Sequence, residues 1–146
     1  MPTHAEQKIV PYTPAQMFDL VDDVGRHPAF LPWCVAARVR SHDETSLVAD
    51  LIIGIKGLQE RFTSQVSLNR ANYIIDVKYD NGPFKYLNNK WKFYTDDPQS
   101  CRLDFYVDFE FRSRLLNHAM GFLFNEAVRR MVGAFERRAA DLYGAA

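Results

Sequence analysis

The segment from Cys101 to Phe111 constrains the fold of this chain most, because apolar and polar side chains alternate strictly along it. Apolar residues hold the odd positions, namely Cys101, Leu103, Phe105, Val107, Phe109 and Phe111. Successive side chains of a β-strand point to opposite faces of the sheet, so the pattern predicts a strand with one buried and one solvated face. Such a strand is typical of an antiparallel sheet that is covered on one side only.

A long amphipathic helix is predicted directly after this strand, at about residues 115–142. At about 100° per residue, its apolar side chains form one narrow stripe, which should face the sheet: Met120, Phe124, Ala127, Val128, Met131, Phe135 and Leu142. A run of strands followed by one terminal helix indicates an α+β fold. We expect a curved antiparallel sheet wrapped around the helix, with room for an apolar ligand between them.

Turn signals divide the rest of the chain into strands and one short helix. Asn81-Gly82 is a hairpin signal, because both residues tolerate the positive φ angles that a tight turn requires. Thr13 is a good N-cap for a helix that we expect to end at Gly25, and residues 26–34 should form a turn or short helix. The remaining strands are predicted at about 4–10, 35–42, 46–55, 59–69, 73–80 and 84–95.

Composition and charge narrow the classes of function. The chain has 146 residues, a net charge of zero and 14% aromatic residues. This length suits one domain, residues 1–146, with a core that needs neither metal nor disulfide. Six arginines and three acidic residues follow Phe111, so the terminal helix is the basic element. This excess is too small to predict nucleic-acid binding, and we expect no DNA partner, although contact with a membrane surface or ribosomal RNA is permitted.

The cysteines and the apolar runs indicate the cellular compartment in which we expect the protein. Cys34 and Cys101 lack metal-binding spacing, and as reduced thiols they point to a cytoplasmic protein. No apolar run approaches the roughly 20 residues of a membrane span, and the N-terminal segment lacks the apolar region of a signal peptide.

The titratable residues do not indicate catalysis. His4, His27, His42 and His118 are scattered, and none forms a ligand-spaced pair with a nearby acid. Each is more simply a surface or local structural residue. We therefore expect no enzyme activity, no catalytic residue and no metal site.

Three segments carry a resemblance to a known family: MFDLVDDVGRHPAFLPWC at 17–34, GPFKYLNNKWKF at 82–93 and MVGAFERRAADLYG at 131–144. Through them, nearly the whole chain resembles the coenzyme Q-binding START-domain family, part of the polyketide cyclase/dehydrase and lipid transport group. It is also similar to the ribosome-association toxin branch of that group. The first two segments are the specific ones. The resemblance implies the helix-grip fold, in which an antiparallel sheet wraps a C-terminal helix around an apolar cavity.

The resemblance also implies two functions of different classes. The first is non-enzymatic binding of ubiquinone, or a related polyprenyl quinone, in support of respiration or quinone biosynthesis, with no cofactor apart from this ligand. The alternative is a ribosome-associated toxin that blocks the association of ribosomal subunits. An aromatase or cyclase would share the fold, but the sequence offers no catalytic constellation for it. We favour quinone binding, because apolar candidate residues are numerous and net basic charge is absent.

The alternation identifies candidate ligand-binding residues. The sheet should contribute Leu51, Ile53, Phe62, Val66, Trp91, Phe93, Phe105, Val107 and Phe109, and the helix should contribute Phe124, Met131 and Phe135. Methionine adapts well to a flexible isoprenoid chain. The sequence does not separate cavity lining from ordinary core.

The outer face of the terminal helix carries a second candidate surface. Leu115 and Phe122 should point away from the apolar stripe, beside Arg129, Arg130 and Arg137. Two apolar side chains flanked by arginines suit transient contact with anionic lipid, such as the inner face of a respiratory membrane. A partner protein, or a second copy of the chain, would fit the same face.

Overall fold

The computed structural model describes residues 3–31, 34–55, 58–98 and 100–144, with side chains described in these ranges except at 55, 58, 80–81, 96–97, 116 and 119–129. Within these ranges the chain forms seven strands: β1 (Thr3–Val10), β2 (Cys34–His42), β3 (Ser46–Ile55), β4 (Leu58–Asn69), β5 (Ile74–Asn81), β6 (Phe84–Asp97) and β7 (Ser100–Phe111). Three helical elements accompany them: α1 (Pro14–Asp22), the 3₁₀ helix η1 (Val24–Ala29) and α2 (Arg114–Tyr143). These bounds confirm the predicted strands and terminal helix to within one or two residues.

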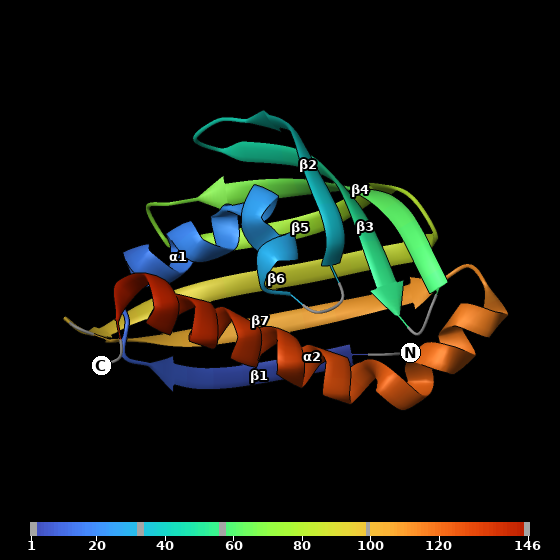
Figure 1. Ribbon diagram of the computed structural model, residues 1–146. Helices are drawn as coiled ribbons and strands as arrows, with labels where there is room; N and C mark the ends of the chain where they lie inside the picture. Colours follow the sequence, from blue (N-terminus) through green and yellow to red (C-terminus); the bar gives the residue numbers. More distant parts are fainter. Residues whose placement is uncertain (1–2, 32–33, 56–57, 99, 145–146) are drawn as a thin grey trace.

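All seven strands belong to one antiparallel sheet in the order β1-β7-β6-β5-β4-β3-β2. Strands β2 to β7 follow one another as a meander, and β1 returns to pair with β7, from Thr3 opposite Asp108 to Val10 opposite Cys101. The sheet is curved, and α2 runs along its inner side in front of β7 and β1 (Figure 1). The predicted α+β arrangement, a curved antiparallel sheet with a C-terminal helix, is therefore confirmed.

Strand β7 has the predicted two-faced pattern. Its odd-numbered residues from Cys101 to Phe111 are all buried, while Tyr106 on the opposite face is exposed. The buried row faces the side of the sheet on which α2 lies, and the polar row forms part of the outer surface of the sheet.

The C-terminal half of α2 holds the helix against the core through Val132, Ala134, Phe135 and Ala139, all at most 3% exposed. The predicted stripe is wrong at Leu142, which is 50% exposed. The reason is that the last turn of α2 contacts α1, where the hydroxyl of Tyr143 donates a hydrogen bond to the Gln16 carbonyl at 3.1 Å. Residues 120, 124, 127 and 128 of the stripe lie outside the described side chains.

The predicted helix boundary at Gly25 is also wrong. Thr13 caps α1 as expected, accepting a hydrogen bond from the Gln16 amide at 3.1 Å. The α-helix ends at Asp22, because Asp23, with φ −79° and ψ 63°, leaves the helical region. The chain then continues as η1, so Gly25 lies inside a 3₁₀ helix.

The hairpin at Asn81-Gly82 is confirmed, and the glycine has the expected positive φ together with a second role. Asn81 still belongs to β5 and, among the described residues, is not one of those with positive φ. At Gly82, φ is +156°, and a Cβ atom would lie only 2.4 Å from the Cβ of Phe62 on β4. Glycine is required because the turn passes directly against the neighbouring strand.

Candidate functional site

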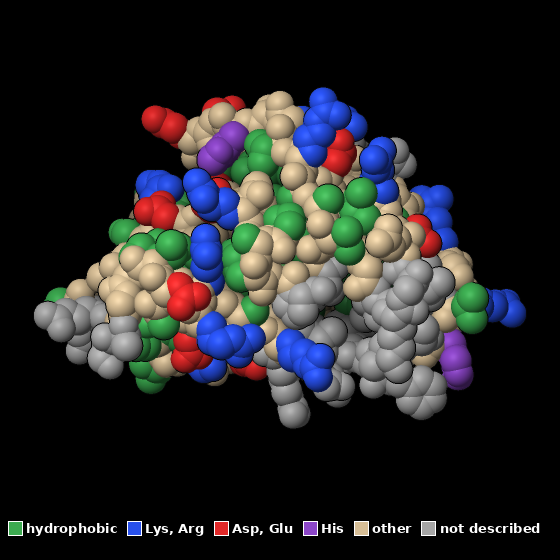
Figure 2. Space-filling model, viewed as in Figure 1, with side chains coloured by type: hydrophobic (Ala, Val, Ile, Leu, Met, Phe, Trp, Pro, Cys, Tyr) green, Lys and Arg blue, Asp and Glu red, His purple; other side chains and the backbone are tan. Residues whose placement is uncertain are grey.

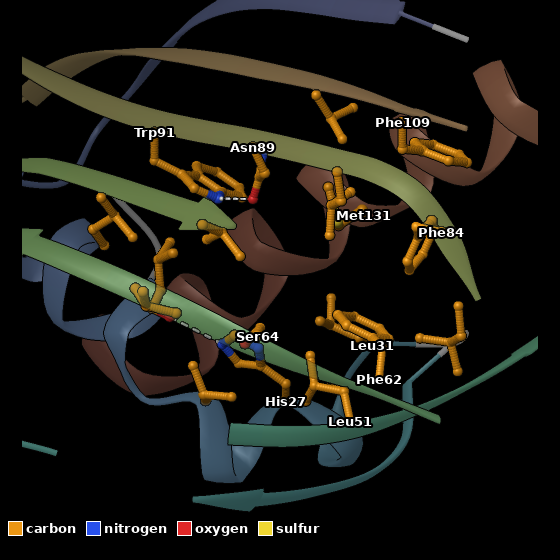
Figure 3. Close-up of a pocket in the computed structure, with 18 of the residues that line it drawn as sticks. His27, Leu31, Leu51, Phe62, Ser64, Phe84, Asn89, Trp91, Phe109 and Met131 are labelled. Atoms are coloured by element: carbon orange, nitrogen blue, oxygen red, sulfur yellow. Dashed lines mark hydrogen bonds between the residues drawn. The ribbon is translucent and has the colours of Figure 1, made fainter. Parts of the chain in front are cut away.

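A cavity of about 190 Å³, accessible to the centres of water-sized molecules, lies between the inner face of the sheet and the helices (Figure 3). One water molecule needs a cavity volume of only roughly 10–15 Å³, so this cavity suits a larger molecule. Of the twenty lining residues that the structure describes, seventeen are apolar. The lining comprises Val21, Val24, His27, Leu31, Leu51, Ile53, Phe62, Ser64, Val66, Ile75, Val77, Phe84, Leu87, Asn89, Trp91, Val107, Phe109, Phe111, Met131 and Phe135.

Nine of the twelve ligand-binding candidates from the sequence line this cavity, namely Leu51, Ile53, Phe62, Val66, Trp91, Val107, Phe109, Met131 and Phe135. Phe93 and Phe105 do not line it. Both are 2% exposed, and both pack against Trp91, with ring centroids 6.1 Å and 4.7 Å away. The inner face of the sheet is thus solid core on one side of Trp91 and hollow on the other. Phe124 lies outside the described side chains.

The lining residues that the sequence did not reveal come mainly from two places. Val21, Val24, His27 and Leu31 belong to α1, η1 and the segment after them, and these elements close the cavity opposite the sheet. Their apolar positions were visible in the sequence, but nothing in it related them to the strands.

Strand β6 contributes the other group. Phe84 faces the cavity from an even position, whereas Leu87, Asn89 and Trp91 face it from odd ones. A register shift between Phe84 and Tyr86 in the pairing with β7 explains the change of parity. Strict alternation cannot anticipate such a bulge.

Aromatic rings make up much of the cavity wall. Phe84 is the centre of one group, with the rings of Phe62, Tyr79, Phe109 and Phe111 at centroid distances between 4.7 and 5.8 Å. Edge-to-face and offset contacts of this kind stabilise the group beyond simple area burial. This end of the cavity therefore has a rigid, apolar wall.

A second group of rings joins the sheet to the helices. Phe135 on α2 contacts Trp91 on β6 at 5.1 Å and His27 on η1 at 5.2 Å. Phe30 completes this group, 5.2 Å from Phe135. Phe135 thus sets the separation between β6 and η1 at this end of the cavity.

Three of the described lining residues have polar side chains. Asn89 donates from Nδ2 to the Tyr106 carbonyl at 2.8 Å and accepts at Oδ1 from Trp91 Nε1 at 3.2 Å. Ser64 on β4 is 1% exposed. His27, the third, is 9% exposed, and its Nε2 lies 3.1 Å from the Val21 carbonyl oxygen.

His27 is uncharged at neutral pH. Burial lowers the pKa of the imidazole from 6.5 to about 4, because the low-dielectric surroundings disfavour the charged ring; hydrogen bonding to Val21 opposes this only partly. From the sequence alone, this histidine was expected at a surface or a local structural position. It is buried, and its bond to Val21 joins η1 to α1.

Among the described residues, the titratable side chains other than His27 are not part of the cavity lining. Within the described ranges, no three His, Cys, Asp or Glu side chains are grouped so as to hold a metal ion. Cys34 and Cys101 are both buried and neither is part of a disulfide, and burial raises the pKa of Cys34 to about 11. No helix in the described part of the chain is both long and apolar enough to cross a membrane.

The fold and the cavity together define a helix-grip protein of the START-like class: a curved sheet and a C-terminal helix enclose a mostly apolar cavity. Residues 10–136 match the family described as polyketide cyclase / dehydrase and lipid transport. The chain belongs to this family, as the resemblance in the sequence indicated.

Named relatives fall into two groups. The chain is 38% identical over 138 residues to the ribosome association toxin RatA of Rickettsia prowazekii, covering 92% of this chain and 94% of the toxin. It is 35% identical over 144 residues to the coenzyme Q-binding protein COQ10 homolog B, mitochondrial, of Xenopus laevis, covering 97% of this chain and 59% of that protein. The solution structure of the 18 kDa protein CC1736 from Caulobacter crescentus is 35% identical, with a TM-score of 0.78 and coverage of 99% and 100%.

Proposed function

We propose that this protein binds a polyprenyl quinone, such as ubiquinone, in its cavity without catalysing a reaction. The observation that carries the proposal is the lining: of its twenty described residues, seventeen are apolar and none carries a charged side chain. Burial of isoprenoid carbon yields about 25 cal/mol per Å², which supplies affinity without ionic contacts. A coenzyme Q-binding relative supports the choice of ligand.

The absence of enzyme activity is part of the proposal. The described lining contains one titratable group, His27, and the bond from Nε2 to Val21 together with its low pKa makes it a poor general base near neutral pH. The ligand would therefore leave the cavity chemically unchanged. Support for respiration or quinone synthesis would come from holding and delivering the molecule.

Organic extraction of the purified protein, followed by mass spectrometry, tests the proposal directly. Protein from a quinone-producing host should carry about one quinone per chain, or take it up after delipidation. If delipidated protein gives no calorimetric response to solubilised quinone, the proposed function fails.

A pair of substitutions on α2 locates the ligand. Met131→Asp places a carboxylate in the cavity wall and should abolish uptake, because an unpaired charge there loses its hydration. Leu142→Asp is the matched control, since Leu142 lies on the same helix and is 50% exposed. Circular dichroism must first show that both variants fold. Normal binding by folded Met131→Asp would place the ligand elsewhere.

Ribosome association is the second candidate, and full-length similarity to a named ribosome association toxin favours it. Arg130 and Arg137 on α2 are exposed, and Figure 2 shows Lys and Arg side chains over the face that carries α1 and α2. This candidate predicts co-sedimentation with ribosomal subunits that weakens steeply with salt, because contacts to RNA release counterions. Changing Arg130 and Arg137 together to Glu should abolish it and leave quinone uptake intact. No co-sedimentation at low salt would remove this candidate.

Quinone exchange would require brief contact with a membrane, because the isoprenoid tail is poorly soluble. Leu115 near the start of α2 is 69% exposed and suits such contact, while Phe122 and Arg129 lie outside the described side chains. Liposome flotation of Leu115→Ser tests this. Unchanged flotation, with a fall in mass from dimer to monomer, would instead assign Leu115 to an interface between two copies.

A further inference from the structure

The polar side chains of the cavity wall differ in how many of their atoms form hydrogen bonds with other residues of the protein. Asn89 is engaged on both sides of its amide, by Tyr106 and by Trp91. His27 and Ser64 line the same cavity from η1 and β4 (Figure 3), and the hydrogen bond of His27 to Val21 engages only its Nε2 atom. A few polar groups in an otherwise apolar cavity wall orient a bound molecule, so these two point to a ligand.

The hydrogen bond of His27 fixes what its ring can offer. A carbonyl oxygen can only accept, so the Nε2 atom that lies 3.1 Å from the Val21 carbonyl must carry the proton. Because the ring is uncharged at neutral pH, Nδ1 then carries a lone pair and acts as an acceptor only. Edge-to-face contacts with Phe30 at 5.7 Å and Phe135 at 5.2 Å hold the ring in this orientation.

Ser64 offers a different capacity. Its side chain is almost fully buried, and it lines the cavity from β4. A hydroxyl group can both donate and accept, so Ser64 can bind a carbonyl or a hydroxyl of a ligand. Ser64 therefore adds affinity for either group and does not distinguish a carbonyl from a hydroxyl.

We propose that His27 and Ser64 form a polar subsite that prefers a ligand head bearing a hydroxyl group, a quinol or another phenol, over the matching quinone. This inference rests on the proposed function. A phenolic O–H donates to His27 Nδ1, whereas a quinone carbonyl can only accept and places its lone pairs against that nitrogen. The protein would then hold the reduced form of its ligand more tightly than the oxidised form.

The subsite also disfavours a charged head. Among the described lining residues none is positively charged, so the carboxylate of a fatty acid would lose its hydration without gaining a partner. The preferred ligand class is thus an uncharged phenol on an apolar tail.

Equilibrium dialysis of delipidated protein against decyl-ubiquinone and its quinol, kept reduced under argon, tests this inference. The expected result is binding of the quinol about five- to tenfold more tightly, as one additional hydrogen bond allows. 4-Decylphenol and its methyl ether form a second pair that cannot change oxidation state. They should show the same preference for the hydroxyl form.

Four variants test which residues cause the preference for the hydroxyl form. His27→Phe keeps an aromatic ring but lacks Nδ1, so the ratio of the two affinities should fall to about one, while His27→Gln, which retains an acceptor, should keep part of it. Ser64→Ala should weaken both forms by a similar factor and leave the ratio unchanged. Ser67→Ala, an exposed position on the same strand, should alter neither affinity.

The outcomes separate this inference from the proposed function. Equal binding of quinone and quinol by the unmodified protein overturns the subsite and leaves quinone binding intact. A preference that persists in folded His27→Phe overturns the role of His27. If neither form binds, the proposed function fails as well.

Discussion

His27 should make this protein lose stability in mild acid, and a single substitution isolates the effect. The folded protein keeps the pKa of the ring at about 4, whereas an unfolded chain restores it to 6.5. Between these values the unfolded state binds a proton that the folded state does not. The stability is therefore intact above pH 6.5 and is lost as the pH falls toward about 4.

The size of the effect follows from the two pKa values. They differ by about 2.5, which corresponds to about 3 kcal/mol once both states are protonated. At pH 5 the unfolded ring is almost fully protonated and the folded ring is not, so the loss is about 2 kcal/mol. The ring is only 9% exposed, so solvent screening reduces this little.

His27→Gln is the appropriate variant, because glutamine does not titrate and can still donate to the Val21 carbonyl. Urea unfolding at pH 7 and pH 5 should show that the unmodified protein loses about 2 kcal/mol more than the variant. All other titrating groups occur in both proteins and cancel in the difference. A difference below about 0.5 kcal/mol, or an NMR titration of the folded His27 ring near its ordinary pKa, would refute the reasoning.

Three further outcomes are expected. Gly82→Ala should lower the free energy of unfolding by roughly 2 kcal/mol or more, because the new methyl group would meet Phe62 at 2.4 Å; thermal unfolding measures this. Thr13→Ala should cost about 1 kcal/mol by removing the cap of α1, and urea unfolding that leaves the midpoint unchanged would contradict this. Cys34 and Cys101 should resist iodoacetamide at pH 8 in the folded protein and react only in denaturant; labelling of native protein, followed by mass spectrometry, would show otherwise.

Local patterns predicted the elements of this fold well, because each depends on neighbouring residues. Alternation over Cys101–Phe111 identified both the strand and its buried face, and Thr13 marked the start of α1. The end of α1 was missed, since the departure of Asp23 from helical angles has no signal in the sequence.

The cavity was harder to predict, because burial and lining are different properties. Phe105 and Phe109 hold equivalent positions in the pattern of β7, yet only Phe109 lines the hollow part of the sheet. Whether a phenylalanine of β7 lines the cavity depends on where Trp91 and Phe135 contact each other. The curvature of the sheet and the position of α2 determine the place of that contact. His27 was missed for a related reason, since a lone histidine in a turn carries no sign that a helix will cover it.

The pairing of the first strand with the last one sets the order in which this protein can fold. Each hairpin of the meander closes a short loop, but β1 meets β7 across separations of 91 residues at Val10 and 105 residues at Thr3. Closing a loop ten times longer costs about 2 kcal/mol more in chain entropy, so β1 should join the sheet late.

A growing chain therefore completes β2 to β6 while its first eight-residue strand still lacks its neighbour. The cavity needs α2 as well, and α2 is synthesised after every strand. A ligand cannot template the early steps, because its binding site exists only when the chain is nearly complete. Binding can then stabilise the finished protein but cannot guide the route to it.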